Sequence, residues 1–399
     1  MSFHAWSHFS VETDSKKAGS AAAKALKEGF GSRPLKAALL YASVTHDQGA
    51  LLRAARAELG PDVPIVGCSV QGVIGNGVVR EGGYLLGAMG LGGDQLKVSV
   101  SIERDIPVDT RTRGRRLGAQ TRARLAEDPK VCVVLYDPLC NADVEQMLAG
   151  LTEELSCPLI GGGAGQPFGP IVKTFQYWQD EVVEHSAIAV GLAGPLTTEL
   201  GVCHGTSPTG FVMTVTRCEG NALLEIDGRR ALDVWLEVTG ASVEEVNNQE
   251  FSSNWAIGIE RTVLAPDGEK HSMYFVRAAF GFDLDRGAVV VQAAIPQGTR
   301  VMLHHRTVPA VTEGTVSMGR DLAARLAGRV PWAVLGFECG ARTSPFLGEA
   351  GTLKENLALQ KTVAGDAPWL GMMAWGEIAP VAGKPAFHNY TYPLLVLAA

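Results

Sequence analysis

The sequence has little of what marks secreted, metal-bound or membrane-spanning proteins. Its seven cysteines among 399 residues are an odd number without any C-x-x-C spacing, so neither a disulfide framework nor a structural zinc site is expected. No apolar run approaches the roughly 18 residues that a spanning helix needs, and the N-terminal segment lacks the basic start and apolar run of a signal peptide. We therefore predict a cytoplasmic location and no membrane partner.

Excess positive charge is also missing. Lys and Arg number 35 against 42 Asp and Glu, which gives a formal net charge of −7. Nonspecific nucleic-acid binding relies on dense positive charge, so no nucleic-acid partner is predicted. Apolar residues make up 46% and charged residues 19% of the chain, a globular composition whose length favours two domains.

Several catalytic and cofactor motifs are absent. There is no G-x-x-x-x-G-K-[ST], H-E-x-x-H or C-x-x-C-H, and the glycines at Gly161 and Gly163 are followed by Gln166 where a dinucleotide fingerprint needs glycine. The segment Gly67–Gly72 misses the G-x-S-x-G nucleophile elbow by one position. No cofactor and no metal site are predicted, and the sequence leans away from an enzyme.

The sequence does contain an internal repeat, whose three copies span 37–91, 131–192 and 332–397. Each reads as an apolar strand, a helix, a loop that carries P-x-[VIL]-G, and a closing strand. The loops begin at Pro64, Pro158 and Pro368.

The stretch between the second and third units differs, because short strands alternate with Gly and Pro turns there. We predict an α/β to α+β, two-domain chain with repeated strand–helix–Gly loop–strand units and mixed sheets. The domains are expected at 1–205, with two repeats, and at 206–399, with the hairpin-rich part and the third repeat.

The three glycine loops follow strands, where ligands tend to bind in α/β folds. We expect them to approach one pocket built from both domains. The alternative is that the glycines only turn tight corners. The candidate ligand-binding residues are Cys68, Ser69, Gly162, Gly163, Cys339, Arg342, Trp375, Glu377, His388 and Asn389.

Two of these candidates have a defined chemical expectation. Arg342 can hold a carboxylate by two parallel hydrogen bonds, although an internal ion pair with Glu338, Glu349 or another acid is an equal alternative. Glu377 or His388 would bind an amine or hydroxyl, and a purely structural histidine is the alternative for His388.

The motifs that carry these residues resemble the FIST family (F-box and intracellular signal transduction proteins). The N-terminal marker resembles 64–72, and the C-terminal markers resemble 221–231, 337–342 and 376–388 with Asn389 and Thr391. One departure is 70–73 (VQGV), where the family tends to have Thr or Ala, Gly and an acid. The resemblance covers roughly 10–395.

The resemblance implies an intracellular sensory module for small ligands, with amino acids proposed. It also implies that some members are haem-based nitric-oxide sensors and that others act in ubiquitin-ligase substrate recognition. We expect a sensory protein that binds an amino acid or other small carboxylate between its two domains and signals through a protein partner. The alternatives are noncovalent haem binding, with His204 or His388 near the loops, and an enzyme with Cys68 or Cys339 as nucleophile.

Overall fold

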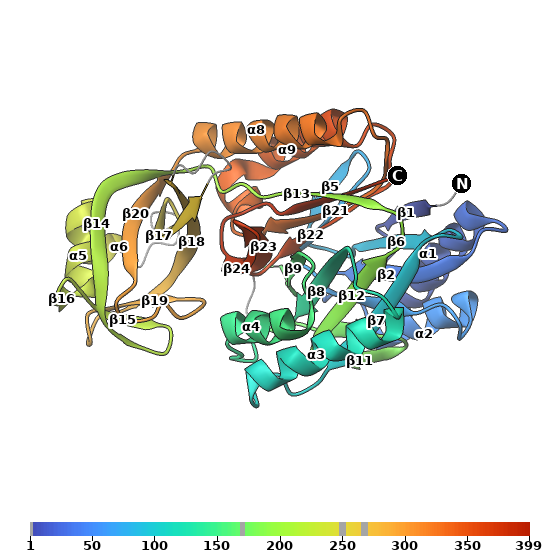
Figure 1. The fold of residues 1–399 in the computed structure, drawn as a ribbon, viewed down its shortest axis with the longest axis horizontal. Helices are drawn as coiled ribbons and strands as arrows, with labels where there is room; N and C mark the ends of the chain where they lie inside the picture. The colour runs from blue at the N-terminus through green and yellow to red at the C-terminus, as the bar shows by residue number, and fades with distance from the viewer. Residues whose placement is uncertain (1–2, 168–171, 247–252, 265–269) are drawn as a thin grey trace.

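The computed structural model describes residues 3–167, 172–246, 253–264 and 270–399. A body of three six-stranded sheets is joined to a smaller unit built on a seven-stranded sheet (Figure 1). Among the described helices, none combines the length and apolar character needed to span a bilayer.

The first sheet-forming unit begins at the N-terminus. Its elements are β1 (His4–Ser10), α1 (Ser15–Phe30), β2 (Leu35–Ala42), α2 (Gln48–Leu59), β3 (Ile65–Ser69), β4 (Gly72–Gly75), β5 (Val78–Glu81) and β6 (Leu86–Gly92). The second unit repeats this order with β7 (Lys97–Glu103), α3 (Thr110–Leu125), β8 (Val131–Tyr136), α4 (Val144–Glu154), β9 (Leu159–Gly163), β10 (Gln176–Trp178), β11 (Glu181–Val183) and β12 (Ala187–Ala193).

The third unit is interrupted. It starts with β13 (Thr197–Gly201) and resumes after residue 306 with α8 (Val308–Leu326), β21 (Pro331–Cys339), η1 (Thr343–Leu347), α9 (Gly348–Val363), β22 (Trp369–Ala374), β23 (Glu377–Val381), β24 (Lys384–His388) and β25 (Leu394–Ala398).

The three sheets share one strand order, and each borrows its last hairpin from another unit. The orders are β1-β6-β2-β3-β10-β11, β7-β12-β8-β9-β23-β24 and β13-β25-β21-β22-β4-β5. Each sheet is mixed, since β2–β3, β8–β9 and β21–β22 run parallel and the other pairings are antiparallel. The hairpins therefore pass from unit to unit in a closed cycle.

A pair of helices covers the outer face of each sheet: α1 with α2, α3 with α4, and α8 with α9 (Figure 1). Asp14, Asp47 and Asp143 cap the first, second and fourth helices through side chains that accept backbone N–H bonds. A Cβ on Gly19 would lie 2.2 Å from the Leu51 carbonyl oxygen. The glycine is what lets α1 and α2 pack this closely.

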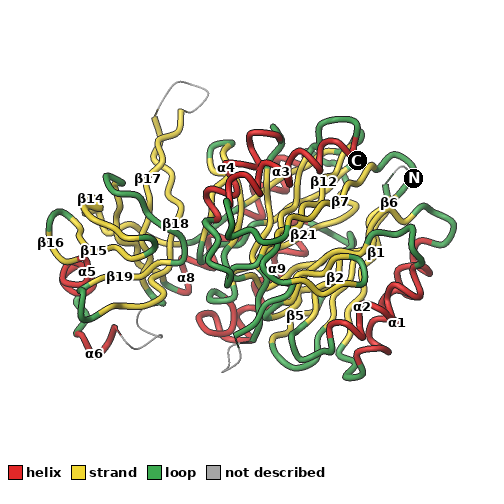
Figure 2. The backbone as a smooth tube through the Cα atoms, turned by 90° about the horizontal axis from the view of Figure 1, so that it is seen from below, coloured by secondary structure: helices red, strands yellow, loops and turns green. Residues whose placement is uncertain are grey.

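The interruption is a separate β structure between β13 and α8. It contains β14 (Thr206–Glu219), β15 (Ala222–Ile226), β16 (Arg229–Arg230), α5 (Ala231–Thr239), α6 (Val243–Val246), β17 (Trp255–Leu264), β18 (Lys270–Asp283), β19 (Ala288–Val291) and β20 (Arg300–Arg306). Pairing of β14 with β15 as well as β20 closes it into a barrel. Figure 2 shows this barrel beside the three-sheet body.

The predicted fold class is confirmed by this arrangement of repeated units and mixed sheets. The predicted boundary near residue 205 falls between β13 and β14. Two details differ from what the sequence predicts. It indicates no strands at the three exchanged hairpins. It predicts a helix only over 318–326, whereas α8 begins at Val308, with Thr307 as its cap.

Candidate functional site

The three glycine loops meet at the centre of the body. The Gly163 amide donates to the Gly376 carbonyl at 2.8 Å, and the Trp375 amide donates to the Gly163 carbonyl at 3.1 Å. The Gly165 amide donates to the Ser69 carbonyl at 2.8 Å. The hairpin exchange brings the loops together, because each hairpin starts in one loop and crosses to the next sheet.

The glycines of these loops contact the protein itself. A Cβ on Gly163 would lie 2.4 Å from the Trp375 carbonyl oxygen, and a Cβ on Gly162 would lie 2.8 Å from the Ala374 Cβ. These positions allow the loops to approach each other rather than a ligand to approach the loops. This is the tight-corner alternative that the sequence had left open.

A cavity of about 890 Å³ lies beside the Trp375 loop, between that loop and strand β18 of the barrel. Its aromatic wall comes from Phe280, Phe282, Trp375 and Tyr390. All of its described lining residues belong to 246–390, whereas the sequence predicted a pocket built from both halves of the chain. The N-terminal half supports the wall from behind.

That support is a side-chain bond. The Trp375 indole N–H donates to Gln71 Oε1 at 2.9 Å, and Gln71 Nε2 donates to the Gly340 carbonyl at 3.0 Å. Gln71 stands in the segment where the sequence departs from the family pattern. It holds two loops of the cavity wall in register.

The polar part of the wall is a pair of amides. Asn389 Nδ2 donates to Gln292 Oε1 at 2.6 Å, and Asn389 Oδ1 accepts from the Ala278 amide at 3.0 Å. Gln292 Nε2 donates to the Trp375 carbonyl at 3.3 Å. These bonds tie the barrel to both core loops around the cavity.

Strand β18 reaches the cavity through a bulge. Ala279 pairs with Val291 and Gly281 with Val290, so Phe280 between them has no partner in the ladder. The Phe280 side chain is 62% exposed and lines the cavity. The bulge thus turns an apolar ring toward the loops.

Three of the ten predicted residues line this cavity: Cys339, Trp375 and Asn389. Cys68 and Ser69 are buried behind the loops, where the Ser69 hydroxyl oxygen accepts from the Phe175 amide at 3.0 Å. His388 points away toward a second groove beside α8, and its Nε2 lies 3.1 Å from the Ala379 carbonyl oxygen.

Glu377 lies directly behind the cavity wall and is fully buried. Its Oε2 accepts from the Thr391 amide at 3.2 Å and from the Thr391 hydroxyl at 3.0 Å. Burial raises the pKa of Glu377 to about 8. The group is therefore largely a neutral acid at neutral pH.

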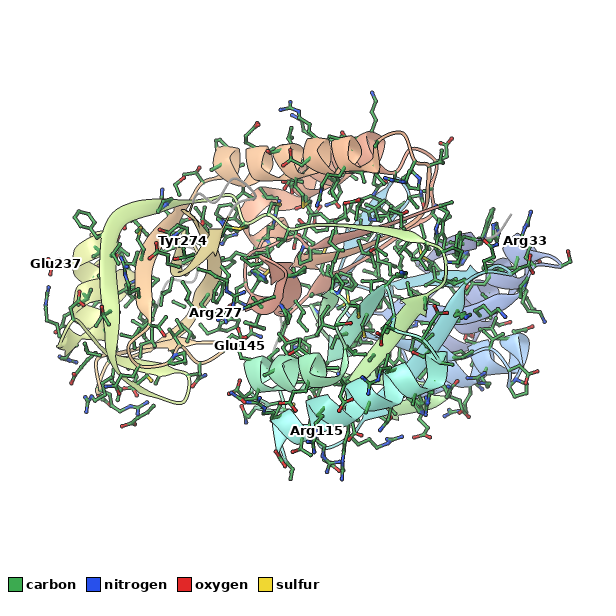
Figure 3. All side chains as sticks on the ribbon, in the orientation of Figure 1. Arg33, Arg115, Glu145, Glu237, Tyr274 and Arg277 are labelled. Atoms are coloured by element: carbon green, nitrogen blue, oxygen red, sulfur yellow. The ribbon has the colours of Figure 1, made fainter. Side chains whose placement is uncertain are left out.

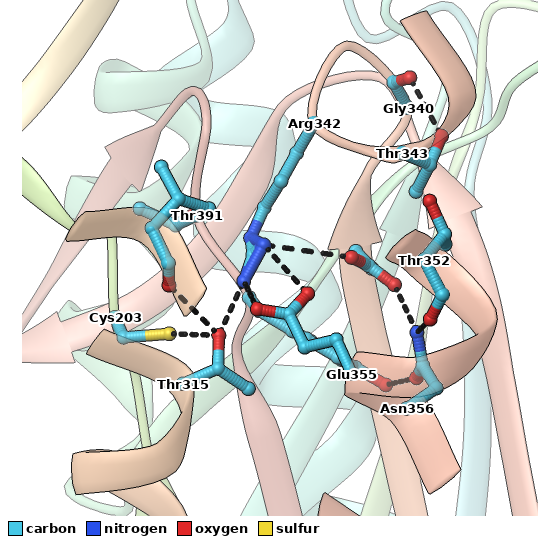
Figure 4. Close-up of polar contacts among 12 residues, drawn as sticks. Cys203, Thr315, Gly340, Arg342, Thr343, Thr352, Glu355, Asn356 and Thr391 are labelled. Atoms are coloured by element: carbon cyan, nitrogen blue, oxygen red, sulfur yellow. Dashed lines mark hydrogen bonds and ion pairs between the residues drawn. The ribbon is translucent and has the colours of Figure 1, made fainter. Parts of the chain in front are cut away.

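Arg342 belongs to a buried network instead of the cavity (Figure 4). Its Nη2 lies 2.7 Å from Glu355 Oε1, and its Nη1 lies 3.6 Å from Glu338 Oε1. Nη2 also donates to the Thr315 hydroxyl, while Asn356 donates to Glu338 at 2.9 Å. The internal ion pair that the sequence offered as an alternative is what the structure contains, with Glu355 as the nearest acid.

The two candidate nucleophiles lie in surroundings that disfavour a thiolate. Burial raises the pKa of the Cys68 thiol and of the Cys339 thiol, and Cys68 Sγ donates to Met372 Sδ at 3.8 Å. The described lining of the cavity includes no imidazole. Cys339 and Tyr390 are the described lining residues of types that ligate haem iron, and burial raises the pKa of both.

Arg306, at the end of β20, is not among the residues predicted from the sequence. This side chain is 1% exposed and lies between the rings of Phe346 and Tyr390. The strand reads RVMLHHR, with an arginine at each end and two histidines, so nothing in its pattern marked Arg306 as the buried one.

Models of the FIST N domain and the FIST C domain match residues 36–229 and 231–380. An uncharacterized Mycobacterium tuberculosis protein is 26% identical over 94% of both chains. A Mycobacterium bovis relative, also uncharacterized, is 26% identical over 53% of each chain, so this chain spans about half the length of that relative.

A solved structure of a cyanuric acid hydrolase from A. caulinodans aligns over 100% of this chain and 99% of that one, with 10% identity and a TM-score of 0.38. A likeness this distant carries no argument about function. FIST domains are generally small-ligand sensory domains in signalling proteins. Because the two domain models together cover most of its length, the chain belongs to the FIST family.

Proposed function

We propose that this protein is a cytoplasmic sensor that binds an amino acid or another small carboxylate in the cavity between the barrel and the three-sheet body. The observation that carries the proposal is the cavity itself. About 890 Å³ is the size of a small-molecule site, and its wall combines aromatic rings with the Asn389 and Gln292 amides. Seven free cysteines fit a reducing compartment.

Signalling would follow from the position of the cavity. One wall is β18 of the barrel and the other is made of loops of the body. A ligand that contacts both walls favours the arrangement in which they are closest, which is a hinge-type change. A protein partner that contacts both units would read this change.

The test is a thermal-shift screen of amino acids and small organic acids against the purified protein. A ligand present at about 100 times its Kd stabilises the folded state by about 2.7 kcal/mol, so a genuine ligand raises the melting temperature clearly. Asn389→Ala should reduce the shift. Arg115→Gln is the matched control, because Arg115 is exposed on α3, away from the cavity (Figure 3).

The proposal fails if no compound in the panel changes the melting temperature and if Asn389→Ala and the parent protein respond alike. Binding that survives replacement of the lining amide and aromatic residues would place the ligand elsewhere in the molecule.

A further inference from the structure

The wall of the cavity is aromatic and carries no charged side chain among its described residues. Phe282 comes from β18, Trp375 from the loop after β22, and Tyr390 from the loop after β24. Rings from three elements around one space are suited to hold a flat, apolar ligand group.

Behind this wall lies Arg306. Its guanidinium carbon is 3.7 Å from the centre of the Tyr390 ring and 4.0 Å from the centre of the Phe346 ring. Nη1 donates to the Ser253 carbonyl at 2.5 Å. Tyr390 and Ser253 both line the cavity, so the guanidinium is one layer of atoms from it.

No acid among the described residues forms an ion pair with Arg306. Within the part of the chain that the structure describes, its Nε and Nη2 have no hydrogen-bond partner and no carboxylate forms an ion pair with it. The other two fully buried arginines do have one. Arg277 lies 2.5 Å from Glu145 across the boundary between barrel and body (Figure 3), and Arg342 lies 2.7 Å from Glu355.

A buried cation without a counter-charge is costly, and a nearby anion removes much of that cost. The layer between cation and cavity is itself unusual. Tyr390 has a φ of +60°, a left-handed conformation that bulky residues rarely adopt. Such conformations cluster at ligand sites, where the surrounding structure holds them in place.

We infer that the ligand is an aromatic carboxylate and that Arg306, not Arg342, selects its negative charge. The inference rests on the proposed function, since it assumes that this cavity is the ligand site. The ring lies against Trp375 and Phe282, and the carboxylate lies toward Tyr390 and Ser253. A tilt of the Tyr390 ring lets Arg306 Nε and Nη2 donate to the carboxylate.

The test compares two probes that differ only in charge. Indole-3-acetate and indole-3-acetamide are titrated into the parent protein by calorimetry, and the carboxylate should bind at least tenfold more tightly. Equal affinities, or tighter binding of the amide, overturn the selection of charge but leave the proposed function standing. Cyclohexylacetate should bind at least tenfold more weakly than indole-3-acetate, and equal binding overturns the aromatic preference.

Arg306→Gln should bring the affinities for the acid and the amide to within about threefold of each other, mainly by weakening the acid. Arg115→Gln should leave the ratio unchanged. The comparison on the parent protein needs no variant, so it decides the matter even if Arg306→Gln does not fold. If neither indole probe binds while aliphatic amino acids still raise the melting temperature, the aromatic inference is wrong and the proposed function survives.

Discussion

Arg342 and Arg306 are both fully buried, yet their surroundings differ completely. Burial acts to lower the pKa of Arg342, but the nearby carboxylates of Glu355 and Glu338 outweigh it and raise the pKa above its ordinary value. Burial lowers the pKa of Arg306 to about 10, and no carboxylate among the described residues opposes this shift. Arg342 is therefore part of an internal ion-pair network, whereas Arg306 remains available to pair with the charge of a ligand.

The largest effect is expected from removing Glu355, the carboxylate that pairs with Arg342. Glu355→Ala leaves Arg342 with Glu338 at 3.6 Å as its remaining carboxylate. Loss of one member of a buried pair typically costs 3–5 kcal/mol, and we expect a loss of about this size in urea unfolding. Glu349→Ala, on the exposed face of the same helix, should cost less than about 1 kcal/mol. Similar losses for the two variants would mean that the network is not what stabilises this region.

A smaller effect is expected from the hydroxyl in the same network. Thr315 accepts from Arg342 Nη2 and is 1% exposed. Thr315→Val keeps the shape but removes the acceptor, and a lost hydrogen bond to a charged group costs about 1.5–3 kcal/mol. Thr315→Ser retains the hydroxyl and should recover most of this loss, as measured by the same unfolding curves. A Ser variant as unstable as the Val variant would point to packing instead.

Replacing Arg306, which has no acid partner among the described residues, should change stability even less. Arg306→Met removes one hydrogen bond and two contacts with aromatic rings. It also removes a buried charge that has no counter-ion in the described part of the chain. Because these changes oppose each other, we expect the free energy of unfolding of the ligand-free protein to change by less than about 1 kcal/mol. A loss as large as that of Glu355→Ala would show that Arg306 is a framework residue.

A separate test concerns the pH dependence that Glu377 gives to stability. Its pKa is raised from 4.5 to about 8 by burial, so the folded protein binds a proton that the unfolded chain releases above pH 4.5. This contribution to stability is complete below that pH and is lost as the pH rises through about 8.

Melting temperatures between pH 5 and pH 9 should therefore fall less steeply for Glu377→Gln than for the parent protein. Glu338 and Glu355, whose pKa values burial also raises, contribute to the slope in both proteins and cancel in the comparison. Parallel slopes would show that Glu377 is ionised in the folded state.

Local signals in the sequence were enough for much of the fold. In the first unit, apolar residues recur at helix spacing up to Leu59 and are followed by Gly60 and Pro61, which predicts a helix over 48–59. The structure gives α2 the same bounds. The exchanged hairpins could not be predicted in this way. For example, β10 and β11 have three residues each, and β10 pairs with β3 of another unit. The spacing of short segments cannot reveal a partner that lies far away in the chain.

The site was harder to predict for the same reason. Cys339 is the last residue of a strand, and Trp375 and Asn389 directly follow strands of the same recognisable unit, so their grouping could be predicted from the sequence. Whether Arg342 or Arg306 is paired depends on acids brought near by the fold, and Glu355 lies on a helix whose buried face had not been assigned. The composition gives the number of charged side chains, but only the fold determines which of them form ion pairs.

The cyclic exchange of hairpins also constrains the order of events during synthesis. The first sheet needs β10–β11 from the second unit, the second sheet needs β23–β24 from the third, and the third sheet needs β4–β5 from the first. The edge of β3 thus stays open until β10 has been made, and the edge of β9 stays open until β23 has been made. Exposed edges invite pairing with other chains, so a truncated product that ends before residue 377 should aggregate rather than fold as a smaller version of the protein.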